Sequence, residues 1–384
     1  MLSTLKTFAA HRPSFAIGLV FAINSVLFGS WVTRIPEVQA NLAITKTELG
    51  VALLMIAIGA LVTMPFMAWV MAKLTIGRTV FLTTIACCIF MTLPLAMPTY
   101  AGLMVALFFA GMANGSMDVA MNAAAASIEQ THDKVIMSTC HGMFSLGGMI
   151  GAVLGSLLAG FGVSPSLHLL VMGSLMLGLT LYLQPTLYNV PHIASEEEQL
   201  FVLPRGSLII LAIIGFGIMI GEGAVADWSA VYLSTVLKGS PFVAGLGFAG
   251  FSLTMAIGRF YGDNLIPKIG AVVMIRWGSL IGALGLLLVI MIPTVVTAIL
   301  GFTLVGLGFS CVVPILFSAA AKVPNVPMGI GVAGVTTAGI LGFLIGPPLI
   351  GFIADSFGLA NGFGFILILA LIAALLASYM PKSA

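Results

Sequence analysis

Three acidic residues lie inside long apolar stretches of this chain: Asp118, Glu222 and Asp227. An ionisable side chain in hydrocarbon costs about 3 kcal/mol or more, so it is rare there and usually marks the path of a solute or a proton. A carboxyl group that takes up a proton loses its charge, which lowers the cost of enclosing it in a closed site. The sequence therefore predicts that protonation of Asp118 or Glu222 is coupled to the movement of a solute.

Two amides accompany Asp118 at helical spacing. Asn114 and Asn122 lie four residues before and after it, so all three side chains share one face of a helix. Lipid cannot satisfy such a face, which predicts that it looks into a helix bundle. One interpretation is a proton acceptor flanked by amides that bind a polar solute. The alternative is a structural acid that pairs with Arg78 or Lys134.

The other two acids belong to one predicted span. Glu222 lies between Gly221 and Gly223, which suits a broken helix that lines a site, although a structural hydrogen bond to a neighbouring span is the alternative. Asp227 is closer to the outer end of the same span. It is a candidate for an outer gate with Arg34, and the alternative is an ordinary pair of interfacial anchors.

Five further residues are weaker candidates for function. His141 can titrate near neutral pH, but a lone histidine on an apolar helix is more often a packed residue. Trp31 and Trp228 can stack on a solute, or they anchor the protein at the membrane interface. Arg259 and Asp263 are expected to brace the inward gate rather than to touch the solute.

Composition places these residues in a membrane protein. Of the 384 residues 60% are hydrophobic and 7% are charged, whereas soluble chains are about 25% charged. The net charge of +2 argues against a nucleic-acid partner. The four cysteines lack metal-ligand spacing, and the sequence shows neither a Walker lysine loop nor a hydrolase motif. We therefore expect no metal, no cofactor, no ATP-driven step and no enzymatic activity.

Apolar runs of about 20 residues, the length that crosses a bilayer, divide the chain into twelve predicted helical spans. One long polar connection predicts an N-terminal six-helix bundle at 1–184, a cytoplasmic linker at 185–206 and a C-terminal six-helix bundle at 207–384. The first run is expected to be a transmembrane helix and not a signal peptide. The spans are predicted at 14–34, 47–71, 79–97, 100–126, 136–162, 166–184, 207–234, 241–260, 271–291, 294–317, 328–353 and 360–380.

The distribution of lysine and arginine predicts the orientation, because cytoplasmic loops are enriched in both. With both termini in the cytoplasm, the outer segments contain only Arg34, Lys46 and Lys238. The acidic run Glu196–Glu198 in the linker does not oppose this orientation. The inner segments then contain Lys6, Arg12, Lys73, Arg78, Lys134, Arg205, Arg259, Lys268, Lys322 and Lys382.

The two predicted bundles also repeat each other. The glycines of span 5 recur in span 11 at a constant offset of 191 residues: Gly148, Gly151 and Gly155 correspond to Gly339, Gly342 and Gly346. Such rows favour close helix packing. The repeat indicates two homologous six-helix bundles, and in transporters of this build the solute site lies between the halves near the midplane.

Together these features resemble the major facilitator superfamily. The cytoplasmic loop signature of that superfamily is visible at Gly258–Asp263, with Lys268 and Gly270. It is degraded at Lys73–Arg78, where Arg78 is a further candidate for a gate residue. More specific strings are similar to the YbjJ-like bacterial inner-membrane group, which is related to the fucose-permease branch. These strings are Gly29–Pro36, Asn114–Asn122, His141–Gly147 and Glu222–Trp228.

The resemblance implies a monomeric secondary transporter that works by alternating access. In the fucose-permease branch an acid followed four residues later by asparagine forms a proton and sugar site, and Asp118 and Asn122 match that pattern. Where the branch has an acid in span 1, this sequence offers Asn24 and Arg34. The expected partners are therefore a small, sugar-like or otherwise polar solute, protons and the lipid bilayer.

Two alternatives stay open from the sequence. The 22 methionines would suit a permissive apolar pocket, and hence a proton-driven exporter of drugs or metabolites. The other alternative is a receptor or scaffold that uses the same fold without transport.

Overall fold

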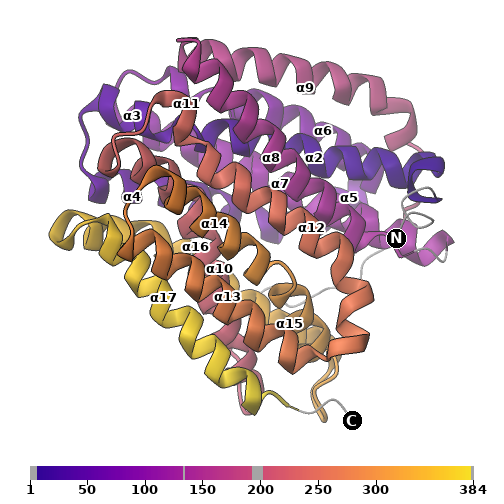
Figure 1. The fold of residues 1–384 in the computed structure, drawn as a ribbon. Helices are drawn as coiled ribbons and strands as arrows, with labels where there is room; N and C mark the ends of the chain where they lie inside the picture. Colours follow the sequence, from indigo (N-terminus) through magenta and orange to yellow (C-terminus); the bar gives the residue numbers. More distant parts are fainter. Residues whose placement is uncertain (1–6, 133–134, 193–201, 382–384) are drawn as a thin grey trace. The chain divides into compact units, whose positions relative to one another are not determined.

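The computed structural model describes residues 7–132, 135–192 and 202–381, without the side chain of Asp263. Every regular element in these residues is helical, and twelve segments are long and apolar enough to cross a bilayer (Figure 1). Helices suit this environment because they satisfy their own backbone hydrogen bonds in lipid. The predicted all-α fold with twelve spans is confirmed. Outside the described residues lie Lys6, Lys134, Lys382 and the acidic run at 196–198.

The chain separates into two compact units. Unit 1 contains Met1–Ile44 and Met55–Glu196, and unit 2 contains Thr45–Leu54 and Glu197–Ala384. One helix, α4 (Lys46–Thr63), therefore begins in unit 2 and continues in unit 1. A short 3-10 turn at Pro65 separates it from α5 (Met67–Leu74), because proline has no backbone donor. The other helices of unit 1 are α2 (Arg12–Val32), α3 (Ile35–Leu42), α6 (Ile76–Phe90), α7 (Tyr100–His132), α8 (Met137–Gly160) and α9 (Pro165–Leu187).

Unit 2 has two interrupted spans. The span that begins with α10 ends in a π-helical turn at Tyr232–Val236, and the span that begins with α14 is interrupted at Ser310–Cys311. The helices of unit 2 are α10 (Leu208–Val231), α11 (Pro241–Ala244), α12 (Leu246–Ile269), α13 (Ala271–Met291), α14 (Val295–Phe309), α15 (Val312–Ala320), α16 (Met328–Phe357) and α17 (Leu359–Leu376).

Glycines bring helix backbones together in both units, as the sequence predicts. In unit 1 a Cβ on Gly29 of α2 would collide with the carbonyl oxygen of Gly148 on α8, and a Cβ on Gly151 would collide with that of Val26. In unit 2 a Cβ on Gly342 of α16 would lie 3.1 Å from the carbonyl oxygen of Phe216 on α10. Small residues permit this approach in membranes, where packing rather than the hydrophobic effect holds helices together.

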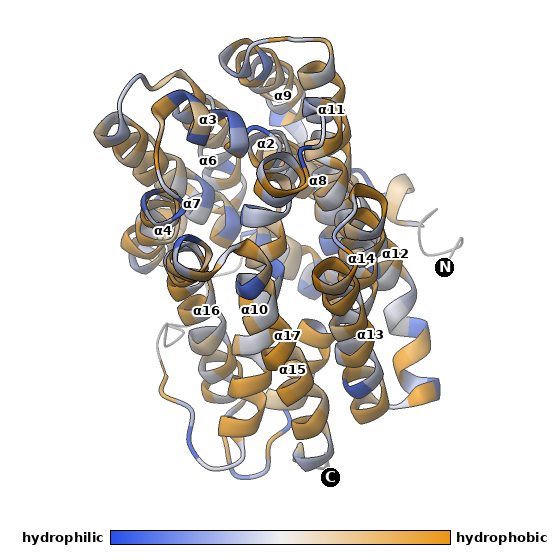
Figure 2. Ribbon diagram, turned by 60° about the vertical axis from the view of Figure 1, so that its left-hand side comes forward, coloured by the Kyte–Doolittle hydropathy of each residue, from blue (hydrophilic) through white to orange (hydrophobic). Residues whose placement is uncertain are grey.

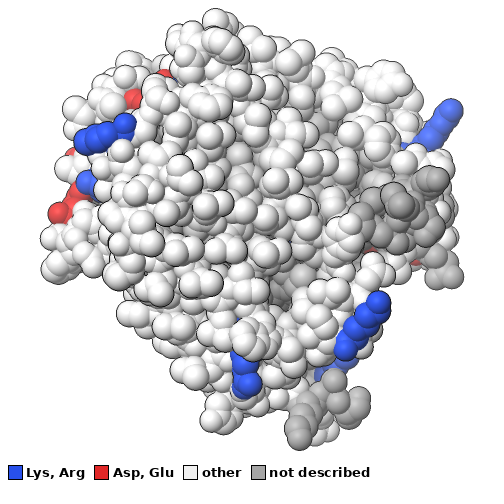
Figure 3. Space-filling view, in the orientation of Figure 1, with Lys and Arg blue, Asp and Glu red and all other residues white. Residues whose placement is uncertain are grey.

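The surface matches a lipid environment. Most of the helical ribbon is hydrophobic, with polar residues concentrated towards helix ends and in short internal segments (Figure 2). The face seen in Figure 3 is almost free of charged side chains except near its edges. Large apolar side chains are exposed on many helices, among them Trp69, Trp277 and Leu375. An aqueous surface rarely carries so many, which is consistent with the membrane location predicted from composition.

Candidate functional site

The strongest polar cluster of unit 1 lies on α7. Asn122 donates from its Nδ2 to Asp118 Oδ1 at 3.3 Å and to the Asp118 backbone oxygen at 2.9 Å. The spacing of four residues therefore places these two side chains together, as predicted. One turn earlier, Asn114 Oδ1 is buried without a hydrogen-bond partner in the described part of the chain. All three side chains are partly exposed.

The structural alternative for Asp118 finds no support among the described residues. No ion pair in this part of the chain involves Asp118. Arg78, one of its two possible partners, lies with its guanidinium carbon 5.7 Å from the ring centre of Tyr188. The other possible partner, Lys134, lies outside the described residues.

Helix α2 contributes buried polar atoms to the same unit. The Asn24 side chain is 3% exposed, and its Nδ2 has no acceptor within the described residues. Trp31 is fully buried, and its Nε1 likewise has no acceptor there. Complete burial does not fit an anchor at the lipid interface, where the indole would contact headgroups. His141 packs edge-to-face on Phe21, with ring centres 5.3 Å apart.

Arg34 is a buried charged residue of unit 1 whose guanidinium group has three partners. Its side chain is 1% exposed. Nε donates to His168 Nδ1 at 3.2 Å, Nη1 pairs with Glu37 Oε1 at 2.5 Å, and Nη2 donates to the carbonyl oxygen of Val163 at 2.9 Å. Arg34 therefore ties the end of α2 to α3 and to the start of α9. The Arg34–Glu37 pair is predictable from its spacing of three residues, whereas a separation of 134 residues does not predict the contact between Arg34 and His168.

In unit 2 the structure brings together two residues for which the sequence predicts separate roles. Glu222 Oε2 on α10 lies 3.7 Å from Arg259 Nη2 on α12, and both side chains are largely buried. The second carboxyl oxygen, Glu222 Oε1, is buried without a partner among the described residues. The predicted gate residue Arg259 thus lies beside the predicted proton site. The side chain of Asp263, the other predicted gate residue of this segment, lies outside the described part.

The expected break in the helix around Glu222 is wrong. α10 runs without interruption from Leu208 to Val231. Gly221 is used for packing instead, since a Cβ there would lie 2.8 Å from the ring of Phe309. The irregular turn comes later, at Tyr232–Val236.

Asp227 and Trp228 follow Glu222 on α10. Asp227 is partly exposed, and no ion pair between described residues involves it. Trp228 is fully buried, like Trp31, and its Nε1 has no acceptor among the described residues. The same holds for the buried hydroxyl of Ser229. This short stretch therefore combines one carboxyl group with two unused hydrogen-bonding groups. The described residues contain no group of three or more His, Cys, Asp and Glu side chains that would hold a metal ion.

Twelve apolar spans, a few of which contain carboxyl or amide side chains within the membrane, are typical of polytopic membrane transporters. The chain matches the Major Facilitator Superfamily over residues 14–334 and 211–383. It is 36% identical to an uncharacterised MFS-type transporter of Yersinia pestis over 356 residues, which cover 92% of each chain. It is 32% identical to the membrane protein MosC of Rhizobium meliloti, over 94% of this chain and 88% of that one. The chain belongs to the Major Facilitator Superfamily.

Solved structures share the fold at low sequence identity. A bacterial homologue of the human lysosomal transporter Spinster superposes with a TM-score of 0.75 at 13% identity, covering 96% of each chain. The fucose:proton symporter FucP of E. coli superposes with a TM-score of 0.64 at 14% identity, covering 96% of this chain and 98% of that one. Membership of the Major Facilitator Superfamily makes the protein a multi-pass membrane protein with bacterial relatives, and a secondary transporter of a solute rather than an enzyme.

Proposed function

We propose that this protein is a proton-coupled transporter of a small polar solute, in which Asp118 and Glu222 are the candidates for the proton site. The observation that carries the proposal is the Asp118–Asn122 pair in the middle of α7. A partly exposed polar face at this depth must open either to lipid or to water. Lipid would leave the carboxyl and amide groups unsatisfied, so we infer that an aqueous path reaches Asp118.

The unused hydrogen-bonding atoms indicate the chemistry of the solute. A buried polar atom without a partner costs about 1–3 kcal/mol, and a ligand that pairs with it recovers that cost. In unit 1 such atoms include Asn24 Nδ2, a donor, and Asn114 Oδ1, an acceptor. In unit 2 they include the indole Nε1 of Trp228. Within unit 1 these atoms combine a donor with an acceptor. A solute with several hydroxyl groups, each both donor and acceptor, suits that combination, which favours a sugar-like molecule.

The charged groups support a solute without strong negative charge. Arg34 is paired with Glu37, and Arg259 with Glu222, so both basic side chains already have an acidic partner. An anionic solute would have to compete for them. The specific strings in spans 1, 4, 5 and 7 further support membership of the YbjJ-like group, related to the branch that contains the fucose:proton symporter.

Ligand-induced thermal stabilisation tests the proposal. The purified protein is screened at pH 6 and pH 8 against sugars, sugar acids, amino acids and common drugs, because a ligand of the folded state raises its apparent stability. We expect stabilisation by a neutral, hydroxylated solute that differs between the two pH values. Stabilisation by drugs alone, with uptake into inverted vesicles, would replace this proposal with an exporter. Binding without flux in proteoliposomes would indicate a receptor.

We also propose that the protein acts as a monomer in the bacterial inner membrane with both termini in the cytoplasm. The excess of lysine and arginine in the segments on that side supports this orientation. Fluorescent-protein and alkaline-phosphatase fusions to each end test it, since the first is active in the cytoplasm and the second outside it. Phosphatase activity at either end would contradict the proposed topology.

A further inference from the structure

Helix α13 is one of the twelve membrane spans (Figure 1), and one arc of its surface is exposed. Val273, Leu284, Leu287 and Met291 are all exposed and recur at helical spacing, so they belong to the same arc. Exposed apolar side chains on a membrane span contact the acyl chains of the bilayer. We therefore call this arc the lipid face of α13.

Arg276 lies on the lipid face, near the start of the helix. At about 100° per residue, Arg276 and Leu287 differ by about 20° around the helix axis. The side chain of Arg276 is exposed. Because α13 begins at Ala271, Arg276 lies about 7.5 Å along the axis from the first residue. A charged group is costly at that depth, and a long arginine side chain avoids the cost by extending to the headgroup region.

The chain supplies no anion for this guanidinium group. In the described part of the chain Arg276 takes part in no ion pair, hydrogen bond or cation–π contact. The sequence also lacks a nearby acid, since residues 264–354 contain neither Asp nor Glu. A second exposed cation, Lys268, lies just before the turn at Gly270 that leads into α13. The start of α13 therefore carries two positive charges that an anion from outside the chain would balance.

Trp277 adds a marker of depth beside Arg276. Its side chain is 60% exposed. Exposed tryptophans favour the headgroup level of the bilayer, where the ring packs on apolar groups and the indole N–H donates to a polar one. A guanidinium group binds a phosphate through two parallel hydrogen bonds. A cation, an interfacial indole and an apolar face thus follow one another in the order of phosphate, glycerol and acyl chains in a phospholipid.

We propose that the start of α13 is a binding site for an anionic phospholipid, whose phosphate is bound by Arg276 and Lys268 and whose acyl chains lie along the lipid face. Charge complementarity selects an anionic lipid, because a zwitterionic headgroup carries its own ammonium group and leaves the two basic side chains unbalanced. In the proposed orientation this end of α13 lies in the cytoplasmic leaflet, whose anionic lipids attract basic side chains. The inference goes beyond the proposed function and involves neither the solute nor the proton.

Quenching of tryptophan fluorescence by brominated lipids tests the site. Trp31 and Trp228 are fully buried, so Trp69→Phe leaves Trp277 as the exposed one of the four tryptophans. This protein is reconstituted in mixtures of phosphatidylglycerol and phosphatidylcholine in which one or the other lipid is brominated. We expect Trp277 to select phosphatidylglycerol about fivefold over phosphatidylcholine, and Arg276→Gln to remove most of that preference.

Lys238→Gln is the matched control. Lys238 is an exposed lysine of unit 2 on the predicted outer side, beyond the π-helical turn of the α10 span. Its replacement changes the net charge as Arg276→Gln does, and should leave the lipid preference at Trp277 unchanged. A second measurement needs no change at Arg276: an increase of the salt concentration from about 0.1 M to about 1 M should lower the preference, because salt screens exposed charges.

Several results would overturn the proposal. Equal quenching by the two lipids would mean that the site does not select anionic lipid, and a preference that survives Arg276→Gln or high salt would remove the charge from the account. Weak quenching by both lipids would mean that a second copy of the chain or another protein covers Trp277. Loss of the preference on addition of inorganic phosphate would make this a phosphate site and not a lipid site. A failed solute screen would leave all of these measurements unaffected.

Discussion

Glu222 on α10 and Arg259 on α12 form an ion pair with 3.7 Å between Oε2 and Nη2, in the interior of unit 2. Removal of one partner leaves the other charge buried, which costs about 3–5 kcal/mol. We expect Arg259→Gln to lower the unfolding temperature clearly, and Glu222→Gln/Arg259→Gln to recover most of the loss. Thermal unfolding of the four proteins in detergent measures the coupling. If the losses of the two single variants simply add in the double variant, the pair contributes no coupling.

The Asp118–Asn122 pair on α7 leads to a separate prediction about transport. Asp118→Asn removes the ionisable group but keeps an oxygen near Asn122, so solute binding should survive within about tenfold while uphill, proton-driven uptake is lost. The pH dependence of ligand-induced stabilisation should disappear with it. Ser116→Ala is the control on the same helix, because that hydroxyl already donates to the Met112 carbonyl oxygen at 2.7 Å. Wild-type uptake and pH dependence in Asp118→Asn would exclude this residue as the proton site.

Asn122 should contribute to the affinity for the solute. Its amide donates to Asp118, and the proposed function makes it a ligand of the solute as well. We therefore expect Asn122→Ala to weaken solute binding about tenfold, which corresponds to roughly 1.4 kcal/mol. Isothermal titration with the solute from the thermal screen measures this. An unchanged dissociation constant would confine Asn122 to a structural role on α7.

The contacts of Arg34 with His168, Glu37 and Val163 predict that changes at Arg34 lower the stability of the protein without abolishing transport. Lysine cannot reach His168, Glu37 and Val163 at once, because it lacks the planar fork of the guanidinium. We expect Arg34→Lys to destabilise the protein by about 2 kcal/mol, from the buried acceptors left unpaired. Glu37→Gln should cost less, since the Glu37 side chain is 33% exposed. Equal unfolding temperatures for Arg34→Lys and wild type would contradict this account.

Close backbone packing predicts contrasting outcomes at two glycines. Gly151→Ala would place a Cβ against the Val26 carbonyl oxygen and should destabilise the protein by about 1–3 kcal/mol. Gly178 lies in α9 with nothing within 4 Å of a built Cβ, so Gly178→Ala should be neutral or stabilising by about 0.5–1 kcal/mol. Thermal unfolding compares the two. A loss of similar size at both positions would mean that helix packing at α2 is not the cause.

Much of this architecture was predictable because a bilayer imposes a fixed length on each span. Apolar runs of about 20 residues therefore predicted the twelve spans found among the described residues, and the four-residue spacing predicted that Asp118 lies beside Asn122. Other contacts depend on tertiary packing and leave no local pattern. Glu222 and Arg259 belong to different helices, so their spacing along the chain says nothing about the 3.7 Å contact.

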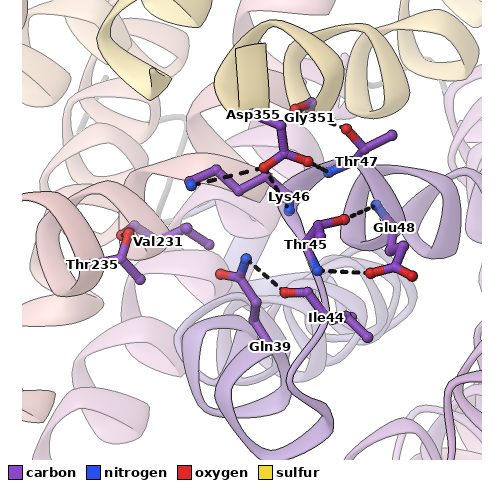
Figure 4. Close-up of polar contacts among 10 residues, drawn as sticks. All are labelled: Gln39, Ile44, Thr45, Lys46, Thr47, Glu48, Val231, Thr235, Gly351 and Asp355. Carbon is purple, nitrogen blue, oxygen red and sulfur yellow. Dashed lines mark hydrogen bonds and ion pairs between the residues drawn. The ribbon is translucent and has the colours of Figure 1, made fainter. Parts of the chain in front are cut away.

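Local rules also failed where packing overrides them. Gly221 and Gly223 weaken an isolated helix, yet α10 continues through both, because its neighbours fill the space that a side chain would occupy. From the sequence, Asp355 is an ordinary polar residue near the end of a helix. Its carboxyl group accepts the backbone N–H groups of Lys46 and Thr47 at the start of α4 (Figure 4), a contact that forms only when residues 309 positions apart come together.

The length and composition of α7 also have a consequence for how the chain is made. The segment Tyr100–His132 is the least hydrophobic of the twelve spans, and it contains Asp118 and both of its neighbouring amides. Leu208–Val236 contains two acids but is among the more hydrophobic spans. From this difference in hydropathy we expect α10 to enter the membrane without help from other helices, whereas α7 should need helices that precede or follow it. We therefore expect an apolar residue in place of Asp118 to improve membrane insertion and yield but to abolish the proposed proton-coupled transport. Membrane insertion would then favour an apolar residue at this position, and transport an acidic one.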